Sequence, residues 1–224
     1  MNILIVSATS NEVEPFMQKH ELSDKPLQTF RTGNHAVTLI ITGVGMTLTA
    51  FSLGQLLAKE KFDFAFNVGL AGSFNENIVI GSVVNVLRDR FGDLGAEDDE
   101  VFLDVFNLKL ADANDFPFCE GWLYNDSVLN STLLNPLQHV RGITVNKVHG
   151  NEKSIAKIIA HYQQDIESME GAAFCYACAM NQLPYLQIRA ISNLVEKRNR
   201  NNWNIPLAVK NLNDWLLLFL NELK

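Results

Sequence analysis

The sequence predicts a single α/β domain built on a mostly parallel β-sheet. Short apolar segments rich in β-branched residues alternate along the chain with segments of helical spacing, which is the pattern of strands joined by crossover helices. Several of these strands end in small residues, as expected where strand ends form a ligand-binding crevice. The 224 residues contain no linker-like or low-complexity run, so we expect one domain covering residues 1–224.

Composition narrows the class of partner. With 47% hydrophobic and 19% charged residues, the chain has enough apolar material for a sizeable core and for a subunit interface, so we expect a homodimer or a higher homo-oligomer. The net charge of -7 is spread without a basic stripe, which argues against a nucleic-acid partner. A small-molecule partner is therefore expected.

The sequence shows no clear signal peptide, membrane span or cysteine-based metal site. Residues 1–6 are apolar but lack a basic flank and a cleavage-like site, so we interpret them as a strand rather than a signal peptide. The apolar run 215–220 is too short to span a bilayer, and we expect a cytoplasmic protein with no membrane partner. Cys175 and Cys178 fall on a predicted helix without a zinc-type partner motif, which indicates buried thiols.

The first strand, predicted over residues 2–8, leads directly into a helix. Thr9 to Asn11 supply capping side chains and place Glu12 in the first helical turn, just beyond the strand. A carboxylate at this place is available to a ligand, but it also complements the helix dipole. Both interpretations stay open at this point.

A glycine motif follows the next apolar strand. After a hairpin turn at residues 31–35, the strand 36–41 ends in Gly43-Val44-Gly45, and a helix is predicted over 47–59. Gly-x-Gly allows backbone amides to approach a ligand closely. Leu48 stands where a dinucleotide fingerprint needs its third glycine, so we exclude a nicotinamide cofactor and expect no other cofactor.

The middle of the chain is less regular. A strand over 63–68 closes in the small-residue segment 69–73, which we interpret as a crevice floor. A strand over 81–86 is followed by an acidic excursion over 89–110. Residues 111–136 show no clear pattern.

The last third returns to the alternating pattern. Residues 195–203 are polar and basic with one large aromatic side chain, Trp203. The predicted strands are 142–146, 166–169 and 185–191, and the predicted helices are 152–161, the segment after Glu170 to about 181, and 205–223.

Glu170 lies where an apolar strand stops and an alanine- and cysteine-rich helix begins. Its carboxylate is expected at the open end of the sheet, where α/β proteins bind ligands. The alternative is that it only caps the helix.

Five motifs occur in order along the whole chain, and each is weak alone. Together they resemble the nucleoside phosphorylase and nucleosidase superfamily, most closely the methylthioadenosine/adenosylhomocysteine nucleosidases. This resemblance implies a three-layer α/β/α fold around a central mixed, mostly parallel twisted sheet. The motifs are Glu12-Val13, Thr42-Gly43-Val44-Gly45, Asn67-Val68-Gly69-Leu70-Ala71-Gly72, Ser168-Met169-Glu170-Gly171-Ala172 and Arg189-Ala190-Ile191-Ser192-Asn193.

Within that branch, residues 91–97, residues 142–146 and Asn193 resemble futalosine hydrolases of menaquinone biosynthesis. The resemblance implies that Glu12 takes a proton from the attacking water and that Glu170 binds the ribose hydroxyls. Met169 would pack against the sugar, although core filling is its alternative role. The remaining implied substrate-binding residues of the crevice are Leu70, Gly72 and Ser192.

Asn193 departs from the adenine-specific relatives, which carry an aspartate there to protonate purine N7. An asparagine amide cannot act as that acid, but it can accept from N7–H and donate to a 6-oxo group. We therefore expect a 6-oxopurine such as hypoxanthine as the leaving base, with Asn193 as a catalytic residue. The alternative is an asparagine that only ties down its own loop.

Water is expected as the nucleophile. Phosphorylases of the superfamily carry an arginine where Asn67 stands, and the sequence suggests no other Arg or Lys beside Gly43 or Gly69. A site without such a cation would hold phosphate poorly.

The aryl carboxylate of a futalosine-like substrate requires a cation and an apolar wall. The resemblance places Trp203 against the 5′-substituent, and Arg198 and Arg200 on the same loop are candidates for the carboxylate, with a solvated basic loop as the alternative. Lys147 and His149 depart from the small residues expected in their segment, which leaves the stacking of the base open.

The predicted function is hydrolysis of futalosine to hypoxanthine and dehypoxanthine futalosine. The alternatives are a methylthioadenosine/adenosylhomocysteine or aminofutalosine nucleosidase and a non-catalytic nucleoside-binding protein. No metal-ligand cluster or covalent-nucleophile motif emerges, so no metal site is predicted.

Overall fold

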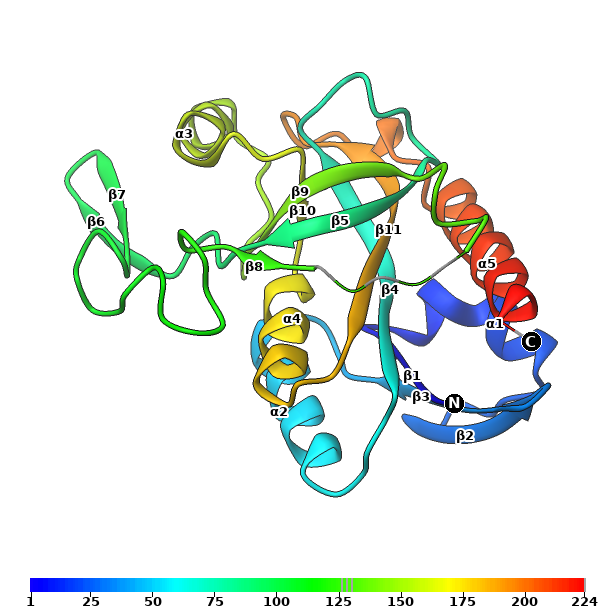
Figure 1. The fold of residues 1–224 in the computed structure, drawn as a ribbon. Coiled ribbons are helices and arrows are strands. Elements are labelled where there is room, and N and C mark those ends of the chain that lie inside the picture. Colours follow the sequence, from blue (N-terminus) through cyan, green and yellow to red (C-terminus); the bar gives the residue numbers. More distant parts are fainter. Residues whose placement is uncertain (126, 128, 130, 224) are drawn as a thin grey trace.

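A computed structural model describes residues 1–125, 127, 129 and 131–223 and has a three-layer α/β/α architecture (Figure 1). A nine-stranded mixed sheet forms the central layer of the described residues. One apolar cluster joins the sheet to helices α1 and α5, and a second joins its other face to helices α2 and α4. The predicted fold class is confirmed.

The observed elements follow the predicted alternation. The helices are η1 (Ser10–Val13), α1 (Glu14–Lys19), α2 (Met46–Leu57), α3 (Glu152–Tyr162), α4 (Gly171–Met180), η2 (Arg200–Asn202) and α5 (Ile205–Glu222). The strands are β1 (Asn2–Ser7), β2 (Leu27–Thr32), β3 (His35–Ile41), β4 (Phe64–Ser73), β5 (Val83–Asp89), β6 (Gly95–Asp98), β7 (Val101–Asp104), β8 (Leu123–Tyr124), β9 (Gln138–Thr144), β10 (Ile166–Ser168) and β11 (Tyr185–Leu194).

The sheet closes on itself through its shortest interior strand. Its order is β10-β9-β5-β11-β4-β1-β3-β2, with β8 paired to β5, and β10 also pairs with β4. Strand β10 is thus parallel to β9 on one side and antiparallel to β4 on the other. Strand β10, which immediately precedes Met169 and Glu170, is therefore hydrogen-bonded to a neighbouring strand on each side. This pairing fixes where helix α4 begins relative to the sheet.

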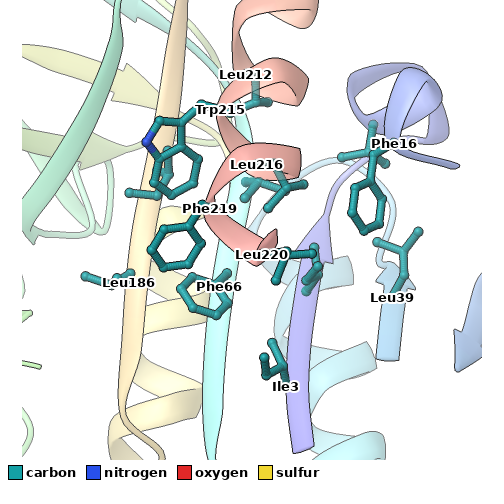
Figure 2. Close-up of a cluster of buried hydrophobic side chains, with 14 of the residues drawn as sticks. Ile3, Phe16, Leu39, Phe66, Leu186, Leu212, Trp215, Leu216, Phe219 and Leu220 are labelled. Atoms are coloured by element: carbon teal, nitrogen blue, oxygen red, sulfur yellow. The ribbon is translucent and has the colours of Figure 1, made fainter. Parts of the chain in front are cut away.

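Helix α5 supplies much of the larger core. Its apolar stripe faces strands β1, β4 and β11, as Figure 2 shows for Leu216 and Phe219 beside Phe66. Both α5 side chains are fully buried, and the Trp215 and Phe219 rings stack with centroids 4.7 Å apart. Asn213 on the same helix is buried as well, and its partners lie in the segment that carries Glu12.

Helices α2 and α4 cover the opposite face of the sheet. Cys175 and Cys178 are buried there and are not in a disulfide, which confirms the interpretation of these cysteines as core thiols. Burial raises the pKa of the Cys175 thiol well above its usual value, since the thiolate would lose its hydration.

Several strands differ from their predicted limits, and β11 runs to Leu194 rather than to residue 191. Strand β4 continues through the glycines to Ser73, because β11 pairs with it along its whole length. Strand β5 extends to Asp89, which is buried rather than part of an exposed acidic segment. Strand β9 starts earlier than predicted, at Gln138, and ends at Thr144. The acidic excursion itself forms the β6–β7 hairpin, which projects from the sheet at the left of Figure 1.

Several large apolar side chains remain exposed on the start of helix α2, namely Val44, Leu48 and Phe51. They are the kind of surface expected of a subunit interface. The expectation of a homo-oligomer stays a prediction that sedimentation analysis would decide. Among the described residues, no helix combines the length and apolarity that crossing a bilayer requires.

Candidate active site

Two carboxylates from distant parts of the chain meet at one buried arginine. Oε2 of Glu170 lies 4.0 Å from Nη1 of Arg189. The same Nη1 and Oε1 of Glu12 both crowd the position that a Cβ at Gly69 would occupy, the latter at 2.9 Å. Only glycine at residue 69 leaves room for this arrangement, so Glu12 and Glu170 open onto the same place.

The two oxygens of Glu12 have different partners. Oε2 accepts the backbone N–H of Thr9 at 3.0 Å and its hydroxyl at 3.1 Å, which completes a capping box at the start of η1. Oε1 accepts the backbone N–H of Leu70 at 3.0 Å, at the end of strand β4. One oxygen therefore serves the start of η1, and the other joins this segment to strand β4.

Asn213 anchors the segment that carries Glu12. Its Nδ2 donates to the backbone carbonyl of Glu12 at 2.9 Å, and its Oδ1 accepts from the backbone N–H of Phe16 at 3.1 Å. Because this amide is buried on helix α5, the position of Glu12 is coupled to the packing of that helix.

Glu170 is the residue at the N-cap of helix α4, yet its side chain caps nothing. Its Oε1 instead accepts from the backbone N–H of Gly45 at 3.0 Å. Gly45 has a φ of 99°, a left-handed backbone that favours glycine, and this conformation turns its N–H toward Glu170. The capping interpretation of Glu170 is thus wrong, and the Gly-x-Gly motif contacts a carboxylate of the site.

The environment of Glu170 works against its ionisation. Burial raises the pKa of its carboxyl above the usual value, and the neighbouring Glu12 adds to the increase. Arg189 and the N–H of Gly45 act in the opposite direction and lower this pKa. The coupling between Glu12 and Glu170 is further evidence that the two carboxyl groups share one site.

Arg189 corrects the expectation that no Arg or Lys lies beside Gly69. It stands directly opposite Gly69 on the neighbouring strand, is 1% exposed, and its Nη2 donates to Oδ1 of Asn67. The sequence did hold a signal for it, because Gln187 and Arg189 alternate with apolar residues in strand β11. Two polar side chains on the same face of a central strand indicate a buried polar site.

Asn193 lies over Gly72 at the ends of strands β11 and β4. Its Nδ2 donates to the carbonyl of Leu194 at 2.8 Å, and its Oδ1 accepts from the hydroxyl of Ser192 at 2.8 Å. The amide is therefore tied to its own loop, as the alternative interpretation expected, and is oriented by that loop. One N–H and one acceptor lone pair remain available to a ligand.

The basic loop, residues 195–203, begins and ends beside Ser192 and Asn193. The backbone N–H of Asn204 donates to the carbonyl of Ser192 at 2.8 Å, which closes the loop that contains Trp203. The guanidinium groups of Arg198 and Arg200 lie 5.1 and 5.7 Å from the centroid of this half-buried indole. Both arginines are exposed and held on one aromatic ring.

Met169 lies beside this site, whereas His149 and Lys147 line a different cavity. Met169 is half-buried between β10 and Glu170. His149 forms a pair with the buried Glu167, with Nδ1 and Oε2 2.6 Å apart, and together with Lys147 it lines a cavity of 740 Å³ beside α3 and the β6–β7 hairpin. In the described part of the chain, no group of three or more His, Cys, Asp or Glu residues is placed to hold a metal ion.

Comparison with known proteins finds a matching family model and relatives that cover most of the chain. A family model described as the phosphorylase superfamily matches residues 2–221. The 5′-methylthioadenosine/S-adenosylhomocysteine nucleosidase of Glaesserella parasuis is 24% identical over 99% of both chains. The futalosine hydrolase of Acidothermus cellulolyticus is 26% identical over 93% of this chain and 86% of the relative.

Solved structures show the same fold. The methylthioadenosine/adenosylhomocysteine nucleosidase from S. pneumoniae, with the transition-state inhibitor MT-ImmA, superposes with a TM-score of 0.79 at 24% identity and covers both chains completely. The native futalosine hydrolase of Helicobacter pylori strain 26695 gives a TM-score of 0.75 at 12% identity, over 99% of this chain and 98% of the other.

The role of Arg189 in the electrostatics of the site is testable without any substrate. In Arg189→Met, the pKa of Glu170 should rise further, because the variant removes an opposite charge that lowers this pKa. A ¹³C NMR titration of the Glu170 carboxyl measures the change. Arg198→Met, at an exposed arginine, serves as the control and should titrate as wild type; equal curves for both variants would contradict the assignment.

Proposed function

The chain belongs to the phosphorylase superfamily, and we propose that within it the protein is a purine nucleoside hydrolase whose preferred substrate is futalosine, releasing hypoxanthine. The observation that carries the proposal is the meeting of Glu12 and Glu170 at Arg189 in one site. N-glycosyl hydrolysis is the activity shared by the names of the relatives, which are nucleosidases and futalosine hydrolases.

The proposed reaction breaks the bond between the ribose anomeric carbon and purine N9. Glu12 takes a proton from a water molecule whose oxygen bonds to the anomeric carbon, and the electrons of the broken bond leave with the purine. Glu170 holds the ribose hydroxyls. Two carboxylates beside a sugar that develops positive charge stabilise the transition state more than the ground state.

The base is selected at Asn193. Its remaining N–H suits the 6-oxo group, whereas the amino group of adenine would meet a donor. The remaining acceptor of the amide suits the N7–H that hypoxanthine carries once the departing anion has taken a proton from water. The hydroxyl of Ser192 and the carbonyl of Leu194 hold the amide in this orientation. Hypoxanthine also leaves more readily as an anion than adenine, so no strong acid is required at N7.

Water remains the favoured nucleophile over phosphate. The reason is no longer the absence of a cation from the site. Arg189 does lie at the site, but Glu12, Glu170 and the amide of Asn67 already surround it. A phosphate dianion would approach one guanidinium flanked by two carboxylates, and the repulsion is strong where water is excluded. A neutral water molecule meets no such barrier.

Adenine release remains the second candidate, because relatives named methylthioadenosine/adenosylhomocysteine nucleosidases match this chain over nearly its whole length. A non-catalytic nucleoside-binding protein is disfavoured, since holding a ribose requires Glu170 but not a second carboxylate across the arginine. We further propose, from the resemblance of residues 91–97, residues 142–146 and Asn193 to futalosine hydrolases, that the reaction serves menaquinone synthesis.

Glu12→Gln should lower kcat/KM for hypoxanthine release by about 10²- to 10⁴-fold, the usual worth of a general base. The released base is measured with and without phosphate, and the wild-type rate should not depend on phosphate. Glu14→Gln, at an exposed position two residues along, is the matched control and should keep wild-type activity. Full activity of Glu12→Gln would exclude Glu12 as the base.

Asn193→Asp should move selectivity toward adenine nucleosides, because a carboxyl group at this place can protonate N7 and accept from the 6-amino group. We expect the ratio of adenosine to inosine cleavage to rise about tenfold or more. Asn199→Asp, on the exposed part of the basic loop, adds the same charge and should leave this ratio unchanged. An equal loss on both nucleosides in Asn193→Asp would show that the amide does not read the base.

The two arginines stacked on Trp203 are proposed to bind the aryl carboxylate of futalosine. Arg198→Ala and Arg200→Ala should each raise KM for futalosine about tenfold, as expected for a hydrogen bond to a charged group. The KM for inosine, which lacks the carboxylate, provides the internal control. Unchanged futalosine KM in both variants would refute the assignment.

A further inference from the structure

Helix α4 begins immediately after Glu170 and needs hydrogen-bond acceptors that Glu170 does not supply. The first N–H groups of a helix have no partner inside the helix, and the N-cap side chain usually provides one. Here the Glu170 carboxylate is turned to Gly45 and Arg189 instead. Another group therefore has to cap this helix if Glu170 is to face the site.

Two side chains provide acceptors. Oγ of Ser168 accepts from the backbone N–H of Gly171 at 3.3 Å, and a threonine from a different strand accepts from the next N–H. The backbone N–H of Ala172 donates to Oγ1 of Thr144, at the end of strand β9, over 2.7 Å. The hydroxyl of Thr144 is 3.0 Å from Oδ1 of Asp89. Because an amide N–H can only donate, the hydroxyl accepts from Ala172 and its own proton is directed to Asp89.

Asp89 is a buried carboxylate that the proposed reaction does not use. It is 1% exposed at the end of strand β5, where its Oδ1 also accepts the N–H of Arg90 at 2.7 Å. Its Oδ2 accepts from Nε2 of the fully buried Gln187 at 2.9 Å. Every partner of this carboxylate is a donor, which is the environment of an ionised acid rather than a neutral one.

The carboxylate also lies directly against the start of the helix. A Cβ at Gly171, the first residue of α4, would collide with Oδ2 of Asp89 and with Nε2 of Gln187. A negative charge at this end of a helix is favoured by the helix dipole. Burial raises the pKa of Asp89, whereas the bonds from Gln187 and Thr144 and the charge of Arg189 lower it.

We propose that Asp89, acting through Thr144 and Gln187, is a positioning residue that caps helix α4 in place of Glu170 and so holds the Glu170 carboxylate toward the substrate. The inference rests on the proposed role of Glu170 in binding ribose. Neither Asp89 nor Thr144 touches the reacting atoms. Their effect is on where Glu170 stands, and it should appear in substrate binding more than in the chemical step.

Two threonine variants separate this role from simple stability. Thr144→Val keeps the shape but removes the acceptor for Ala172 and the donor to Asp89, and we expect KM for the nucleoside to rise about tenfold with a smaller change in kcat. Thr144→Ser keeps the hydroxyl and should restore KM to within about twofold of wild type. Thermal unfolding of each variant is measured in parallel.

A charge exchange tests Asp89 itself. Asp89→Asn sets two amide nitrogens against each other at Gln187, and KM should rise as in Thr144→Val. In the double variant Asp89→Asn with Gln187→Glu, the new amide donates to the new carboxylate and its oxygen still accepts from Thr144, so KM should recover. A lowered melting temperature with unchanged KM in Thr144→Val and in Asp89→Asn would overturn the proposal.

A failure of the proposed function can be told apart from a failure of this inference. If the wild-type protein releases no base from any purine nucleoside, the proposed function is wrong, and the positioning role is then read from the ¹³C NMR titration of the Glu170 carboxyl. Thr144→Val should shift that titration and Thr144→Ser should leave it in place. Superimposable curves for all three proteins would refute the inference.

Discussion

The candidate site depends on the buried cation Arg189. The guanidinium of Arg189 is almost completely removed from water, and such a charge is stable only where opposite charges and acceptors surround it. Glu170 lies 4.0 Å from one guanidinium nitrogen, Oδ1 of Asn67 accepts from another, and Glu12 lies nearby at Gly69. These residues come from helix termini and a strand that are far apart in sequence, so the surroundings of the arginine include both carboxylates.

The two carboxylates beside Arg189 differ in whether they cap the helix in which, or before which, they lie. Glu12 caps its own short helix with one oxygen and reaches strand β4 with the other. The side chain of Glu170 does not cap its helix. The hydroxyls of Ser168 and Thr144 accept from its first N–H groups, and Asp89, held by Gln187, accepts from Thr144. A side chain can face a ligand from the first turn of a helix only when something else accepts the N–H groups it abandons.

The fold class and the places of Glu12 and Glu170 were predictable, because strand and helix patterns are local and because ligands gather at the carboxyl ends of parallel strands. Arg189 was missed because its partners are non-local, and the sequence does not show which strands pair. Asp89 was assigned to an exposed acidic run for the same reason, since its neighbours in sequence are polar whereas its neighbours in space are strands β9 and β11. For Asn193 the sequence left two roles open, and the geometry makes them compatible: the bonds to its own loop orient the amide.

The double pairing of β10 constrains how the chain length can vary. Only three residues form this strand, and both of its edges are occupied, so a one-residue insertion or deletion there would reverse which side chains face each side of the sheet and rotate the start of α4. The β6–β7 hairpin, whose two strands pair only with each other, bears no such restriction. We therefore expect natural variants to differ in length at the β6–β7 hairpin. The number of residues from Ser168, which pairs with Thr144, to Glu170 should stay constant.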